Sequence, residues 1–222
     1  MEKNVLVVNF KTYRTGTGRD ALNLARVHEG VAGMARKKII IAVQAADIFR
    51  ISREVSLDIF AQHADPVAFG TFTGFLLPEA LKEGGASGTL LNHAENRMDD
   101  SRLKDAIKRC KSVGLETLVC TDSISQARML AKLSPTYIAF EEPELISTGM
   151  SVSRVNPESV RGFVKAVRKS GPSVIPLCGA GVSTGDDVRK ALELGTRGAL
   201  VSSAVMKSDR PRDLLFDLVK HL

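Results

Sequence analysis

Short runs of β-branched and other apolar residues alternate along this chain with longer segments in which apolar residues recur at helical spacing. The short runs predict buried strands, and the longer segments predict amphipathic helices. Strands are expected at residues 5–10, 38–43, 57–61, 89–92, 116–120, 136–140, 174–177 and 198–201. Helices are expected at residues 21–35, 47–52, 78–83, 101–113, 125–133, 157–169, 186–194 and 211–221.

Strands that alternate with helices in this way predict an α/β fold built on a parallel sheet. No linker, low-complexity run or change in composition interrupts the chain, so one domain over residues 1–222 is expected. A closed (β/α)8 barrel and a doubly wound open sheet both have this pattern. The barrel is favoured because the first strand ends in Asn9-Phe10-Lys11, and not in the glycine-rich turn of a dinucleotide-binding sheet.

The sixth expected strand runs directly into an acidic segment, FEEPELISTG, which begins at residue 140. Side chains alternate between the two faces of a strand, so Tyr137, Ala139 and Glu141 share one face while Phe140 and Glu142 share the other. The bulky Phe140 suits packing against outer helices. We therefore expect Glu141 to point into the barrel, where it can act as a base, and Glu142 to point away.

Polar or glycine residues also end four other expected strands: Asn9 with Lys11, His93, Gly181, and Ser202 with Ser203. By alternation, Lys11 and His93 point inward, and His93 stands just before an expected helix start. A Lys is costly to bury unless it meets an anion. The turn at Gly181 and the short helix expected after Ser202 are typical of the phosphate cradle that barrels build after their last two strands.

Charge and composition narrow the choice of ligand. The net charge is +6 and the isoelectric point is near 9.3, but the basic residues are dispersed. Aromatic residues make up 5% of the chain, Trp is absent and no nucleic-acid motif is present, so no nucleic-acid partner is expected. A positive field of this kind suits a small anionic substrate.

The same sequence predicts a cytoplasmic protein without a metal. No apolar run approaches the roughly 20 residues needed to span a membrane, and the first apolar run is too short for a signal peptide. Three cysteines without a C-x-x-C pair argue against a disulfide framework. Only the weak pair His63-x-Asp65 suggests metal ligands. Two alternative functions remain at this point: a metal-dependent phosphosugar epimerase, and a barrel that serves as a binding or scaffold protein without catalysis.

Six stretches come in the order of one enzyme family and together span the chain: VVNFKTY, AQHADP, FTGFLLPEALKEGGASGTLLNHAENR, EPELISTG, LCGAGVSTG and LVSSAV. By these the chain resembles the triosephosphate isomerases, and more closely their shorter archaeal form. The resemblance implies a single-domain TIM barrel without cofactors that interconverts D-glyceraldehyde 3-phosphate and dihydroxyacetone phosphate in glycolysis and gluconeogenesis. It also implies a homodimer, or a homotetramer, in which the loop of residues 64–74 reaches the neighbouring subunit.

The resemblance implies a role for each matching residue. Glu141 would shuttle the proton through an enediol(ate), His93 would polarise the carbonyl, and Lys11 would steady the phosphate and the developing charge, with Glu95 as its partner. Residues 142–149 would form a closing lid. Substrate contacts would come from Asn9, Lys11, Ile146, Ser147, Gly181, Ser202 and Ser203. The chain departs from most relatives at Glu142, where they have Pro, and at Ser147, where they have Gly; bacterial and eukaryotic relatives have Ser at Gly181.

Overall fold

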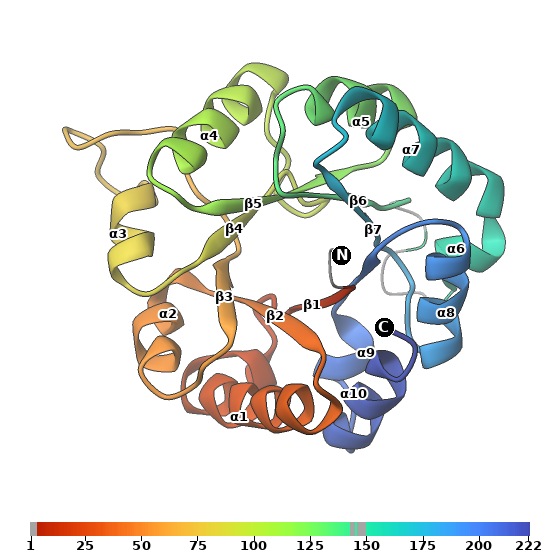
Figure 1. Ribbon diagram of the computed structural model, residues 1–222. Helices are drawn as coiled ribbons and strands as arrows, with labels where there is room; N and C mark the ends of the chain where they lie inside the picture. The colour runs from red at the N-terminus through yellow and green to blue at the C-terminus, as the bar shows by residue number, and fades with distance from the viewer. Residues whose placement is uncertain (1–3, 143–144, 146–149) are drawn as a thin grey trace.

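The strands close into a barrel in which each one lies beside the next in sequence (Figure 1). The computed structural model describes residues 4–142, 145 and 150–222. All of the strand pairs are parallel, and β8 closes the ring by pairing with β1. The helices form a ring outside the strands. This confirms the predicted barrel and excludes an open sheet, because an open sheet would leave β1 and β8 unpaired with one another.

The bounds of the elements agree with the predicted pattern to within a few residues. The strands are β1 Val5–Asn9, β2 Lys38–Val43, β3 Asp58–Ala61, β4 Gly88–Leu91, β5 Glu116–Thr121, β6 Tyr137–Phe140, β7 Ile175–Cys178 and β8 Gly198–Val201. The helices are η1 Arg14–Gly16, α1 Gly18–Ala35, α2 Ala45–Ser52, α3 Pro78–Glu83, α4 Asp100–Ser112, α5 Ile124–Ala131, α6 Val152–Val155, α7 Pro157–Ser170, α8 Gly185–Glu193, α9 Ser203–Met206 and α10 Pro211–Val219. Among the described residues, none of these helices has the length and apolar character that crossing a membrane requires.

The differences from prediction lie in short helices and helix starts. Helix α6 was not predicted, because four residues are too few to show a helical period. Helix α9 agrees with the short helix expected after Ser202. Helix α1 begins at Gly18 and not at residue 21, and the Gly18 N–H donates to Asp47 Oδ2 of α2 at 2.8 Å. A tertiary contact of this kind satisfies a helix-start donor that the local sequence leaves open.

The core has two layers, one inside the barrel and one between strands and helices. Tyr137 and Ala139 of β6 belong to the inner layer, whereas Ile138 and Phe140 belong to the outer layer. Phe140 stacks on Phe163 of α7 with ring centroids 5.2 Å apart. Burial of each such large apolar side chain contributes about 1.5–3 kcal/mol. The alternation predicted for this strand is confirmed, and it sets the direction of the residue that follows.

Closure of the ring depends on a glycine at the start of β8. Gly198 lies opposite Val5 in the register of β8 and β1. Its φ is +147°, and a Cβ at this position would lie 1.8 Å from the carbonyl oxygen of Val5. Any other residue would push β8 away from β1, so glycine is what allows these two backbones to meet.

Candidate active site

Side chains and loops from several strand ends meet around one cavity at the carboxyl end of the barrel. The cavity has a volume of about 330 Å³. Asn9, Lys11, His93 and Glu141 line one part of it, and the loops that follow β7 and β8 line the rest. The carboxyl ends of the strands are where barrels of this kind carry their chemistry.

Glu141 follows β6 directly, and its side chain lies in the cavity with 4% of the residue exposed. Its backbone N–H donates to the Thr121 carbonyl at 2.9 Å, which continues the ladder between β5 and β6. Its side chain packs against Gly179, where a Cβ would come within 2.5 Å of Glu141 Cγ. Within the described part of the chain, Glu141 Oε2 has no hydrogen-bond partner. A buried carboxylate oxygen without a partner is available for a proton from a ligand.

Glu142 has the opposite orientation. Its Oε1 accepts a hydrogen bond from Asn156 Nδ2 at 2.8 Å, and Asn156 caps the start of α7. Glu142 is not among the residues that line the cavity. The two neighbouring carboxylates therefore differ as the strand alternation predicts, one facing the cavity and one tied to an outer helix.

A buried thiol lies behind the carboxylate of Glu141. Cys120 of β5 is 1% exposed and belongs to the inner layer of the core. Burial raises the pKa of this thiol, and the negative charge of Glu141 raises the pKa further. Cys120 therefore stays protonated beside Glu141 and adds no second charge to the site.

His93 follows β4 and is 8% exposed. Its Nδ1 accepts a hydrogen bond from the backbone N–H of Glu95 at 3.1 Å, which leaves the proton of a neutral ring on Nε2. Nε2 lies 3.6 Å from Glu141 Oε1. The imidazole therefore directs an N–H donor toward the cavity, close to the carboxylate.

Helix α4 lies where residues 101–113 were predicted to be helical, but the expectation that His93 stands just before a helix start is wrong. Helix α4 begins only at Asp100, and the intervening turn is held by Asn92 Oδ1, which accepts the Met98 N–H at 3.0 Å. The dipole of a helix acts mainly within its first turn. The tautomer of His93 is set instead by the N–H of Glu95, a contact that strand and helix patterns do not reveal.

Lys11 reaches the cavity through a left-handed backbone turn. Its φ is +48°, and its N–H donates to Asn9 Oδ1 at 2.9 Å. Its ammonium lies 2.6 Å from Glu95 Oε1, with 10% of the Lys side chain and 56% of the Glu side chain exposed. Asn9 and Lys11 thus both line the cavity, as expected, but a strained turn places Lys11 there and not strand alternation.

The other end of the cavity is formed by the loops that follow β7 and β8. The loop after β7 contributes Gly181 and Ser183, and the start of α9 contributes Ser202 and Ser203. Gly181 has φ +69°, and a Cβ there would lie 1.9 Å from the Met150 carbonyl oxygen. The loop after β7, together with the short helix α9 after β8, suits an anionic group such as a phosphate.

Two polar residues that line the cavity, Ser183 and Lys207, are absent from the predicted site. Ser183 follows Gly181 by two positions, and Lys207 lies just beyond the end of α9. The Lys207 ammonium stands over the Tyr13 ring at 5.9 Å from its centroid. The spacing of Lys207, four residues after Ser203 on an expected helix, is the signal that could have found it. Lys207 adds a second cation to the end of the cavity that carries the backbone loops.

Two of the predicted contacts cannot be placed. Ile146 and Ser147 lie outside the described residues, as does most of the predicted lid of residues 142–149. Of the other predicted contacts, Glu95 lines a neighbouring depression together with Lys11 and His93. The lid and its contacts stay predictions.

The pair His63-x-Asp65 is occupied by structural contacts. Asp65 Oδ1 accepts from Arg102 at 3.0 Å, and its Oδ2 accepts the N–H of Leu76 at 2.8 Å. His63 Nε2 lies 3.3 Å from Asp65. In the part of the chain that the structure describes, no group of three or more His, Cys, Asp or Glu side chains could hold a metal ion. The pair therefore shapes the loop after β3.

Comparison with known proteins identifies the family. The family profile described as "Triosephosphate isomerase" matches residues 4–221. The chain belongs to the triosephosphate isomerase family. The predicted resemblance, including its archaeal character, is confirmed by relatives at over 40% identity from methanogenic archaea.

Two relatives and one solved structure show how far this family membership extends. A triosephosphate isomerase of Methanobacterium bryantii is 43% identical over 221 residues, which cover 100% of this chain and 98% of that protein. One of Methanocaldococcus jannaschii is 42% identical over 218 residues, with 98% and 100% covered. A crystal structure of triosephosphate isomerase from Bartonella henselae, 20% identical, has a TM-score of 0.74 and covers 98% of this chain and 96% of its own. That last likeness concerns the fold.

Proposed function

We propose that this protein is a triosephosphate isomerase, which interconverts D-glyceraldehyde 3-phosphate and dihydroxyacetone phosphate without a cofactor. The observation that carries the proposal is the 3.6 Å separation between Glu141 Oε1 and His93 Nε2, in a cavity that Lys11 also enters. Full-length relatives that bear this name support the same activity.

The reaction moves a proton between two adjacent carbons. Glu141 takes the proton from the carbon next to the carbonyl, which leaves an enediol(ate) with negative charge on its oxygens. The Nε2–H of His93 and the ammonium of Lys11 stabilise this charge more than they stabilise the neutral carbonyl of the substrate. Glu141 then returns the proton to the neighbouring carbon, and the hydroxyl proton passes from one oxygen to the other, so that the hydroxyl and the carbonyl exchange places. Atoms and charge balance with no external oxidant or reductant.

The phosphate of the substrate would lie at the backbone end of the cavity. Gly181, Ser202 and Ser203 line this end, and Lys207 stands at its edge. Backbone N–H groups and a nearby cation bind a phosphate without specific side chains. This places the reacting carbons between the phosphate and Glu141.

The proposed substrate and product place the enzyme in glycolysis and gluconeogenesis, and hence in the cytoplasm. Both compounds are phosphorylated three-carbon sugars, and both directions of sugar metabolism need them to interconvert. The net charge of +6 favours the encounter with such anions.

A coupled assay without added cofactor tests this proposal. We expect the purified protein to turn over glyceraldehyde 3-phosphate at about 10 s⁻¹ or faster, within the usual range of enzymes. Excess chelator should leave the rate unchanged, because proton transfer here needs no metal. Loss of turnover in chelator would favour a metal-dependent epimerase. Phosphate binding without turnover in any condition would favour a binding protein.

We also infer that the protein acts as a homodimer at least. The loop after β3 exposes three large apolar side chains, Phe69, Phe72 and Phe75, with 77%, 44% and 47% of each residue exposed. Figure 1 shows the segment between β3 and α3 projecting from the barrel. A projecting apolar loop suits insertion into a second copy of the chain.

Sedimentation at micromolar concentration should therefore give a dimer or a tetramer. Phe72→Asp should shift the protein toward the monomer and lower its activity. Met34→Asp, at an exposed apolar residue of α1 that is 56% exposed, is the matched control and should sediment like wild type. A fully active wild-type monomer would contradict the inference.

A further inference from the structure

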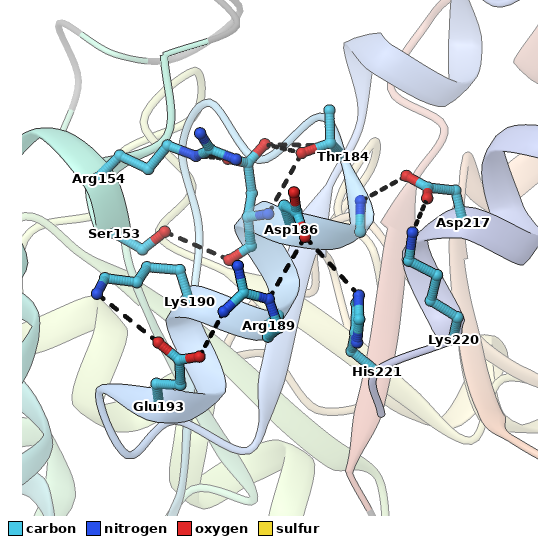
Figure 2. A network of polar contacts seen from close by, with 12 residues as sticks. Ser153, Arg154, Thr184, Asp186, Arg189, Lys190, Glu193, Asp217, Lys220 and His221 are labelled. Carbon is cyan, nitrogen blue, oxygen red and sulfur yellow. Dashed lines mark hydrogen bonds and ion pairs between the residues drawn. The ribbon is translucent and has the colours of Figure 1, made fainter.

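Two carboxylates stabilise the first turn of α8, and they have different neighbours (Figure 2). Asp217 of α10 accepts the Gly185 N–H at 2.6 Å and the Lys220 ammonium at 2.5 Å. Asp187 belongs to α8 itself and completes a capping box with Thr184. Of these two carboxylates, only Asp187 also accepts hydrogen bonds from the loop after β7, which lines the cavity.

One oxygen of Asp187 holds the end of that loop. Oδ2 accepts from the Ser183 N–H at 3.0 Å, the Ser183 hydroxyl at 3.2 Å, the Thr184 N–H at 3.0 Å and the Thr184 hydroxyl at 2.9 Å. Asp187 is 3% exposed. Burial alone would raise the pKa of this carboxyl, but the hydrogen bonds from Ser183, Thr184 and Arg154 outweigh it and lower the pKa. The Asp187 carboxylate is therefore a charged acceptor for the donors of Ser183, Thr184 and Arg154.

The other oxygen and the backbone of Asp187 hold α6. Oδ1 accepts from Arg154 Nε at 2.5 Å, and the Asp187 carbonyl accepts from the Ser153 hydroxyl at 3.3 Å. Figure 2 shows Arg154 and Ser153 reaching from their helix toward the start of α8, on the other side from Asp217. The Val152 N–H adds a contact to the Ala180 carbonyl at 3.4 Å. Residues 152–154 are thus joined to the loop after β7 and to the start of α8 by three contacts, of which the one from Arg154 is to the Asp187 carboxylate.

The loop that Asp187 holds is one of those that line the cavity. Gly181 and Ser183 line the cavity, and Gly181 packs so closely on Met150 that a Cβ would not fit. Backbone N–H groups bind an anion well only when their directions are fixed beforehand. A simple helix cap would stabilise α8 and would not need the bond to Arg154.

We propose that Asp187 is a positioning residue, which fixes the loop of residues 179–184 against α6 so that its backbone can bind the phosphate of the substrate. The proposal rests on the proposed function for the identity of the ligand. Asp187 itself does not line the cavity and acts through Ser183 and Gly181.

Asp187→Asn and Asp217→Asn form a matched pair that tests this role. Asn at position 187 keeps one oxygen but sets an amide donor against either Arg154 or the donors of Ser183 and Thr184. We expect the inhibition constant of inorganic phosphate and KM to rise about tenfold while kcat changes less than about threefold, as expected when ground-state and transition-state binding weaken together. Asp217→Asn should lower the unfolding temperature but leave phosphate binding within about twofold of wild type. Equal phosphate constants in the two variants would overturn the proposal.

Arg154→Met tests the same positioning role if Asp187→Asn fails to fold. The Arg154 side chain is 55% exposed, so its loss should not prevent folding. We expect phosphate binding to weaken about threefold, an effect near the limit for a partly exposed ion pair. An unchanged phosphate constant in Arg154→Met would overturn the proposal. Calorimetry with inorganic phosphate needs no turnover. Absence of isomerase activity would therefore contradict the proposed function, while the positioning role of Asp187 could still be tested by phosphate binding.

Discussion

Glu141→Gln is expected to lower kcat by about a hundredfold or more, the usual loss when a positioned base is removed. The amide has nearly the shape of the carboxylate but cannot accept a proton from carbon. The contacts that set the backbone, from the Glu141 N–H to Thr121 and from the Gly179 N–H to Phe140, do not involve the side chain and should persist. KM should therefore change little, because the lost interaction belongs to the chemical step. Steady-state kinetics in the coupled assay measure kcat and KM of the wild type and of Glu141→Gln. Thermal unfolding of the same two proteins shows whether the fold is kept.

Glu142→Gln is the matched control. The amide oxygen of Gln can still accept the hydrogen bond from Asn156 Nδ2, so the start of α7 should keep its contact. We expect kcat within about threefold of wild type, in line with small effects of changes that leave contacts in place. If both variants lost activity to the same extent, the assignment of Glu141 as the base would be wrong, and the acidic segment would act as a unit.

Lys11→Met is expected to lower kcat/KM by about a thousandfold. The Lys11 ammonium and the anionic substrate would form a close, poorly hydrated charge pair in the cavity, and removal of one member of such a pair costs several kcal/mol. The Lys11 ammonium is the cation that stands beside both Asn9 and His93 in the cavity. Met has a similar length and no charge, so the shape of the site should survive. Inhibition by inorganic phosphate should disappear over the accessible concentration range.

Loss of Lys11 should cost the fold little. Its partner Glu95 is 56% exposed and can be hydrated when the ammonium is gone. Lys207→Met removes the same charge from an exposed position at the edge of the same cavity, where water and salt screen it. Its effect on kcat/KM should stay within about threefold. A larger loss in Lys207→Met than in Lys11→Met would show that Lys207, and not Lys11, is the cation on which substrate binding and turnover depend.

The order of the elements and the direction of Glu141 could be read from the sequence because both follow from short-range rules. Apolar alternation places the strands, and the period of a strand decides which of Glu141 and Glu142 faces inward. The inner position of Ala139 and the outer position of Phe140 agree with this rule. Asn9, Gly181, Ser202 and Ser203 were also found from their places at strand ends, whereas the roles of Glu95, Ile146 and Ser147 came from the family resemblance. Pattern reasoning also missed Lys207 and Ser183, which enter the cavity through loops and not through strands.

The sequence by itself thus determined the succession of strands and helices, the two faces of β6 and the candidate base, since each rests on the period of one local element. Tertiary structure alone decided the rest. The N–H of Glu95 selects the tautomer of His93, a left-handed turn delivers Lys11, and Asp187 ties the loop after β7 to α6. These are single hydrogen bonds between groups in turns, or between segments far apart in the chain, and no periodicity encodes them. The contact of Asp187 with Arg154 exists only once the ring of strands has closed, whereas the contacts of His93 and Lys11 join residues two positions apart in turns.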